Sequence, residues 1–175
     1  MMCRKMCRLG LQSAASGLAS LFLCSTVLAQ QDEPGRDTPA VESEVTLPAA
    51  PQKSSLLPFY VSATATMDFA IDAKSLSVTP EGIVRYTLVI TSKAGASNIS
   101  YEGIRCSSAE KKLYATGKAD GGWSPSRRDV WSPIWDVGAN RQHAALVKDY
   151  FCEGASVAGK AEAIIERLRR QKPLK

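Results

Sequence analysis

The sequence has a single histidine, His143, and none of the short motifs that mark most hydrolase, nucleotide-binding and metalloprotease sites. No G-x-S-x-G, H-E-x-x-H, Walker or G-x-G-x-x-G pattern is present. A catalytic triad or a histidine-bound metal would therefore depend on His143 alone. These absences argue against a metal site, and we expect the protein to use no cofactor.

The chain also lacks an apolar run long enough for a stable transmembrane helix, which takes about 20 residues. Its most apolar stretch runs from Leu18 to Leu28 and follows a basic start that has no acidic residue. Val27 and Ala29 are small residues of the kind that a signal peptidase accepts before its cut. We therefore predict a cleaved signal peptide over residues 1–29, with retention of this segment in the membrane as the alternative.

Cysteine becomes scarce after that cleavage, because three of the five cysteines lie within the signal peptide. The two that remain, Cys106 and Cys152, belong to a chain bound for an oxidising compartment, which predicts a disulfide between them. This crosslink would stabilise the fold by up to roughly 4 kcal/mol. A reactive thiol or a two-cysteine metal site is the rival interpretation, but it lacks a second pair of metal ligands.

A large charge imbalance is absent from the body of the chain, although the formal net charge is +5. Residues 59–153 carry eleven basic and ten acidic side chains, and the basic excess lies in the signal peptide and in residues 154–175. A nucleic-acid-binding domain should carry its basic residues along one face of the fold. We therefore expect no nucleic-acid partner.

Aromatic residues are missing from residues 30–58, which contain five prolines and five acidic residues. Such a segment cannot bury enough apolar surface to offset the entropy of ordering it. We predict that residues 30–58 form a disordered, acidic, proline-rich tether.

From residue 59 the pattern changes to that of β-strands. Alternating or strongly β-forming runs predict strands over residues 59–71, 83–91, 98–106 and 112–117, with short turns between them. Short connections are typical of an antiparallel meander. In the third run the apolar residues change parity, which predicts a β-bulge at Gly103.

Helical patterns follow the strands. Asn140 is the predicted N-cap of a helix that ends near Phe151 and carries His143 on its apolar stripe. Residues 154–175 predict a second, basic amphipathic helix. The predicted fold is an α+β domain over residues 59–153, with an antiparallel sheet of four or five strands, a helix packed on it and a C-terminal helix. A small β-sandwich or barrel is the alternative.

Four stretches of this sequence resemble a known family: RYTLV at residues 85–89, YEGIRC at 101–106, NRQH at 140–143 and DYFC at 149–152. They are similar to the CNP-one-like family, small exported proteins of Gram-negative bacteria that have no established activity. The likeness covers roughly residues 59–152. It implies a periplasmic location and supports the cysteine pairing, but it supplies no catalytic residues.

A candidate ligand surface is formed by tryptophan and arginine residues near the predicted helix. Tryptophan rings stack on sugars and cations, and arginine binds carboxylates such as those of peptidoglycan stems. The alternative is that the tryptophans only cover the open face of the sheet. A place on the apolar stripe likewise favours a packed histidine over a catalytic one. The candidate ligand-binding residues are Trp123, Trp131, Trp135, Arg127, Arg141 and His143.

These patterns predict a non-enzymatic periplasmic module that binds an envelope protein, peptidoglycan or another anionic envelope ligand. The alternative is a hydrolase of cell-wall or lipid material that uses His143 and Glu102. Such an enzyme would need His143 exposed in a cleft beside a carboxylate or a hydroxyl group. The basic C-terminal helix adds the expectation of a peripheral contact with a membrane or a partner, and such a contact would leave the stability of the domain unchanged on truncation.

Overall fold

The computed structural model describes residues 41–135 and 138–174 of the chain. The predicted signal peptide and residues 30–40 of the predicted tether lie outside the described residues.

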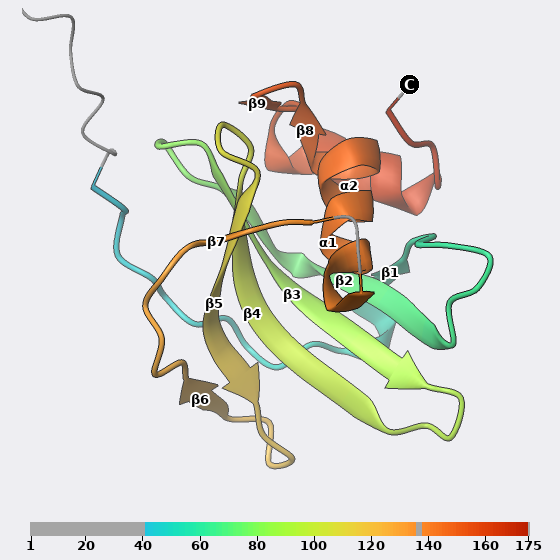
Figure 1. The fold of residues 1–175 in the computed structure, drawn as a ribbon. Helices are drawn as coiled ribbons and strands as arrows, with labels where there is room; N and C mark the ends of the chain where they lie inside the picture. Colours follow the sequence, from blue (N-terminus) through green and yellow to red (C-terminus); the bar gives the residue numbers. More distant parts are fainter. Residues whose placement is uncertain (1–40, 136–137, 175) are drawn as a thin grey trace, which may run out of the picture. The chain divides into compact units, whose positions relative to one another are not determined.

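An antiparallel sheet of seven strands forms the centre of the described domain (Figure 1). Strands β1 to β6 lie side by side in chain order, and β7 pairs with a different part of β5 than β6 does. Residues 83–89 in the middle of the sheet are all buried, as expected for a strand that is covered on both faces. The strands are β1 Leu56–Pro58, β2 Met67–Val78, β3 Ile83–Ser92, β4 Ser97–Arg105, β5 Glu110–Gly117, β6 Trp123–Pro125 and β7 Ser132–Pro133.

Short helices cover one face of this sheet. The α-helix α1, Arg141–Leu146, continues directly into a π-helical turn, η3, Val147–Phe151, and α2 spans Ala161–Arg169. A two-residue pairing of β8, Cys152–Glu153, with β9, Ser156–Val157, separates them. Two 3₁₀ turns complete the helical elements: η1 Lys53–Ser55 and η2 Gly138–Asn140.

The predicted fold class is wrong. The large sheet has seven strands instead of four or five, and the helices beside it are few and short. The extra strands β1, β6 and β7 have only two or three residues each, and each contains a proline that limits ladder pairing. Pieces this short show no periodicity in a sequence. The sandwich or barrel alternative is not met either, because in the described part the end strands β1 and β6 do not pair with each other.

The predicted bulge at Gly103 is also wrong. The register of β3 with β4 is unbroken from Ile83 opposite Arg105 to Thr91 opposite Ser97. The irregularity lies instead on β5, where Tyr114 is an extra residue in the pairing with β4. Glycine is needed at position 103 for another reason, since a Cβ atom there would lie 2.5 Å from the Tyr114 hydroxyl oxygen.

Because β4 alternates regularly, its side chains divide between two covered faces. We call the face with Tyr86 and Glu102 the helical face, since it packs against α1, η3 and α2. We call the opposite face, which carries Arg85 and Tyr101, the outer face. The N-terminal segment, residues 41–50, crosses the outer face before the chain enters β1 (Figure 1). This part of the predicted tether therefore lies against the sheet.

The predicted disulfide is confirmed. Cys106 and Cys152 are bonded, with their Cα atoms 5.6 Å apart. The bond joins the chain just after β4 to the chain just after η3, so it links the sheet to the helices that cover it.

Helix α2 packs on its own domain. Ile164 and Leu168 are fully buried in the main core, and the Arg167 guanidinium donates to the backbone oxygens of Tyr150 and Ala158 at 2.6 and 3.1 Å. The apolar stripe that was expected to meet a membrane or a partner therefore packs in the core. The peripheral contact of this helix and the effect of its truncation on stability stay predictions.

Candidate functional site

The helical face holds a buried polar group of three side chains. His143 on α1 places its Nε2 atom 2.6 Å from Glu102 Oε2, and the Tyr86 hydroxyl donates to the same oxygen at 3.1 Å. Ser100 donates to the other carboxylate oxygen at 2.6 Å. The carboxylate of Glu102 thus has a partner on both oxygens, which a buried charge requires.

Burial and hydrogen bonding act in opposite directions on Glu102. Burial alone raises the pKa of this carboxyl group, but the hydrogen bonds and positive charge of His143, with help from Ser100, outweigh it and hold the pKa below the ordinary value of 4.5. Burial, together with the neighbouring carboxylate, raises the pKa of Tyr86 well above 10. Glu102 is therefore a carboxylate at neutral pH, and Tyr86 is a neutral donor.

This group has the residue types of an acid–base site but not its access to solvent. His143 is 2% exposed and Glu102 is 7% exposed, and the side chain of Tyr86 is fully buried. His143 Nδ1 is buried and has no hydrogen-bond partner among the described residues. The arrangement can lock α1 onto the sheet, whereas proton transfer to a substrate would first require α1 to move.

The outer face carries a second group, in which cations alternate with aromatic rings. The Arg105 guanidinium lies 4.1 Å from the centre of the Trp131 ring, and that of Arg85 lies 5.4 Å from the centre of the Tyr114 ring. Lys112 Nζ lies 5.5 Å from the centre of the Tyr114 ring and 5.8 Å from the centre of the Trp131 ring. At these distances each cation is attracted electrostatically to the face of the ring beside it.

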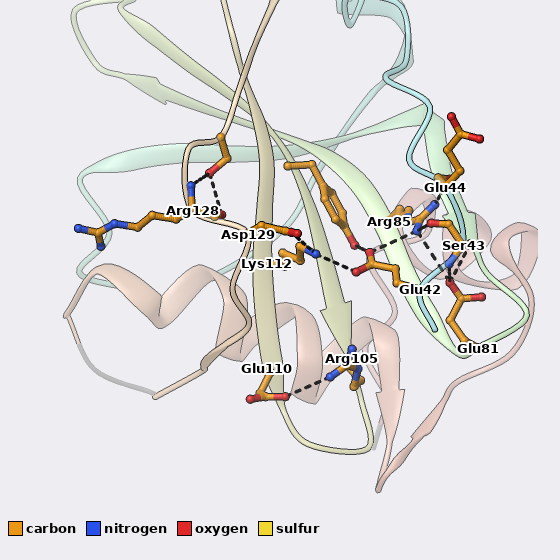
Figure 2. Close-up of polar contacts among 12 residues, drawn as sticks. Glu42, Ser43, Glu44, Glu81, Arg85, Arg105, Glu110, Lys112, Arg128 and Asp129 are labelled. Atoms are coloured by element: carbon orange, nitrogen blue, oxygen red, sulfur yellow. Dashed lines mark hydrogen bonds and ion pairs between the residues drawn. The ribbon is translucent and has the colours of Figure 1, made fainter. Parts of the chain in front are cut away.

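The carboxylate of Glu42 joins the cations of this row. Its Oε2 atom accepts from Lys112 Nζ at 2.9 Å, and its Oε1 atom accepts from Arg85 at 3.2 Å and from the Tyr114 hydroxyl. Figure 2 shows Lys112 and Arg85 reaching this carboxylate from two different strands. Lys112 also pairs with Asp129, which is exposed.

The backbone of the N-terminal segment is bound at four further points. Arg85 donates to the carbonyl oxygens of Ser43 and Glu44 at 2.5 and 3.0 Å, and Trp123 Nε1 donates to that of Pro48 at 2.7 Å. The Ser43 backbone N–H and hydroxyl both donate to Glu81. The outer face thus holds this segment through a carboxylate and through backbone oxygens.

On the outer face, hydrogen bonds between opposite charges stabilise the ionised forms of Glu42 and Lys112. Burial raises the pKa of Glu42, but its hydrogen bonds to Tyr114, Lys112 and Arg85 prevail and hold it below 4.5. Burial lowers the pKa of Lys112, yet its bonds to Asp129 and Glu42 raise it overall. The pKa of Tyr114 is raised, first by burial and then by its bond to Glu42. At neutral pH Glu42 is therefore a carboxylate, Lys112 is a cation, and Tyr114 is a neutral donor.

The structure separates the predicted ligand-binding residues. Trp123 and Trp131 are half-buried and belong to the outer face. Trp135 is 63% exposed, Arg127 and Arg141 are exposed, and no contact brings these three to the row on the outer face. His143 lies on the helical face, where it contacts Glu102.

Neither the cations of the row nor Glu42 was predicted from the sequence as a site residue. Arg85 stands within the strongest predicted strand, at a position of opposite parity to the apolar residues, and Lys112 and Tyr114 share one parity in the fourth run. Charged residues such as Arg85, on the face of a strand opposite to its apolar residues, could have indicated a polar site on that face. Glu42 gave no signal, because it pairs with residues 43 to 72 positions away.

Two general features of the described residues bear on function. None of the helices within residues 41–135 and 138–174 is long and apolar enough to cross a membrane. In the same part of the chain, no three or more His, Cys, Asp or Glu side chains are grouped so that they could hold a metal ion.

Comparison with known proteins supports the resemblance seen in the motifs. The sequence profile of the CNP1-like family matches residues 35–169. The chain is 27% identical over 113 residues to "Cryptic neisserial protein 1" of Neisseria gonorrhoeae (strain ATCC 700825 / FA 1090). This match covers 58% of the present chain and 55% of that protein, so it spans about half the length of the relative. No solved structure matches the chain. Since the family match covers most of the sequence, this protein belongs to the CNP1-like family.

Proposed function

We propose that this protein is a non-catalytic binding module of the periplasm that uses the outer face of its sheet to hold an envelope component. One observation carries the proposal: the row of cations and aromatic rings already grips an extended chain segment through a carboxylate and backbone oxygens. Surfaces of this kind suit peptides and anionic polymers, since guanidinium groups bind carboxylates and ring faces stack on apolar or cationic groups.

The proposed location rests on the predicted signal peptide. The disulfide between Cys106 and Cys152 supports it, because such bonds form and persist in oxidising compartments.

A hydrolase remains the second candidate, and one observation favours it. His143 has both a carboxylate and a hydroxyl group in its hydrogen-bonded group, as an acid–base site requires. Against it, His143 and its partners are buried between α1 and the sheet, whereas the groups of the outer face lie beneath an N-terminal segment that is held mainly by polar contacts. We therefore favour binding.

The proposal can be tested by site-specific photo-crosslinking in living cells. A photoreactive residue in place of Trp131 lies in the row, and one in place of Tyr60, which is 66% exposed and away from the row, is the control. We expect a discrete adduct from position 131 only, and we expect Arg105→Gln to weaken it, because Arg105 lies over the Trp131 ring. Equal adducts from both positions, or none from position 131, would contradict the proposal.

A further inference from the structure

The N-terminal segment lies on the outer face as a bound peptide would. Residues 42–48 have no regular secondary structure of their own, and side chains of the sheet hold them instead of strand pairing. Arg85 and Trp123 both bind backbone carbonyl oxygens of the segment, and every peptide has such acceptors. This part of the recognition therefore does not depend on the sequence of the segment.

Charge adds selectivity to that recognition. The carboxylate of Glu42 receives donors from Arg85, Lys112 and Tyr114, so the site selects an acidic side chain. The guanidinium is not saturated by the segment, since Arg85 Nε is buried without a hydrogen-bond partner among the described residues. Arg85 itself is only 5% exposed. A ligand with one more acceptor at this point would make a contact that the segment does not make.

The segment contributes little to the apolar core, which would be unusual for a permanent part of the fold. The side chain of Val41 is 94% exposed and that of Leu47 is 36% exposed. Its attachment is mostly polar, so a ligand that offers equivalent acceptors can replace these contacts at small net cost.

We propose that the outer face is a binding site for an extended, acidic peptide segment of another protein, and that residues 42–48 occupy it as an internal ligand which the partner displaces. The inference rests on the proposed function and adds to it the class of ligand and the competition. Because the internal segment is tethered to the sheet, its effective concentration at the site is on the order of millimolar. A partner must therefore compete with it, and weakening the segment should increase the affinity for the partner.

The test uses a labelled peptide with the sequence of residues 41–49, VESEVTLPA, as the probe. Its binding to the exported chain is followed by fluorescence anisotropy in the wild type, in Glu42→Gln and in Glu44→Gln. The two variants remove the same charge two residues apart, but only the Glu42 carboxylate contacts the row, whereas Glu44 is bound through its backbone oxygen. Circular dichroism confirms that each variant is folded.

We expect the probe to bind Glu42→Gln at least about tenfold more tightly than the wild type, since hydrogen bonds to charged groups are roughly twice as strong as neutral ones. Glu44→Gln should behave like the wild type, and a probe with glutamine at position 42 should not gain affinity. Equal binding to the two variants, or no binding to either, overturns the inference. Dimerisation of Glu42→Gln by light scattering would also overturn it, because the occupant would then be a second copy. If the probe fails while crosslinking from position 131 persists, the inference is wrong and the proposed function stands.

Discussion

Glu102 is the residue through which helix α1 and the sheet are joined in the polar part of the core. It accepts hydrogen bonds from Tyr86 and Ser100 on the sheet, and it contacts His143 on the helix. Removing one member of a buried charged group leaves the others without a partner, which is far more costly than losing an exposed contact. The group therefore explains why a polar histidine stands on an apolar helical stripe.

We predict that Glu102→Gln lowers the free energy of unfolding by about 2–4 kcal/mol at pH 7. The folded pKa of Glu102 is depressed below 4.5, so its stabilisation is complete above that pH and is lost as the pH falls through the folded pKa. The difference between wild type and variant should thus narrow below pH 4.5. Urea unfolding at several pH values measures it, with the exposed Glu44→Gln as the control. A difference in the free energy of unfolding that widens in acid would contradict this assignment. His143→Ala should also lower the free energy of unfolding at pH 7, because it removes a partner of Glu102.

Gly103 is a second position at which one residue type is required, because Tyr114 fills the space beside it. A methyl group there would lie 2.5 Å from the Tyr114 hydroxyl oxygen and 2.9 Å from its Cε2 atom. We predict that Gly103→Ala lowers the free energy of unfolding by about 1–3 kcal/mol, because the added methyl group displaces the Tyr114 ring. The melting temperature should fall accordingly. In a Tyr114→Ala background the same substitution should cost almost nothing, and a double-mutant cycle measures this coupling. Additive effects would show that another contact is responsible.

At the scale of elements, the central strands were predictable and the short ones were not. Strands β3 and β4 lie within one residue of their predicted bounds, because long β-forming runs carry a clear signal. The first strand was predicted over residues 59–71, but β2 spans Met67–Val78, because the alternation continues through a loop whose Phe59 is buried without pairing as a strand.

The burial of His143 followed from its helical stripe, whereas the row on the outer face depends on contacts between distant segments and left no local pattern.

Helix α2 gives a prediction at this scale. Ile164 is fully buried and Ile165 only partly, although they are neighbours in the same helix. We predict that Ile164→Ala lowers the free energy of unfolding by about 2–4 kcal/mol, and that Ile165→Ala lowers it clearly less. Thermal unfolding of the two variants decides this. Equal, small effects would mean that the helix does not pack on the domain in solution.

For the whole molecule, the disulfide is the covalent link between the sheet and its helical cover. We predict that the chain from residue 30 onward, produced in an oxidising compartment, has no free thiol when it is unfolded without reductant, because Cys106 and Cys152 are bonded. Two equivalents of reactive thiol in that assay would exclude the bond. Reduction should lower the free energy of unfolding by up to roughly 4 kcal/mol, since it releases the constraint on the unfolded chain.

The position of the N-terminal segment in the chain has a consequence for the order of folding. Glu42 precedes Arg85 by 43 residues and Tyr114 by 72, so a chain emerging from its N-terminus exposes the segment long before its site exists. Contacts across such separations form late, after the local hairpins of β2 to β5. We therefore expect the segment to dock only after β3 and β5 have formed. Amide hydrogen exchange should then report release of the segment at a free-energy cost far below that of unfolding the sheet.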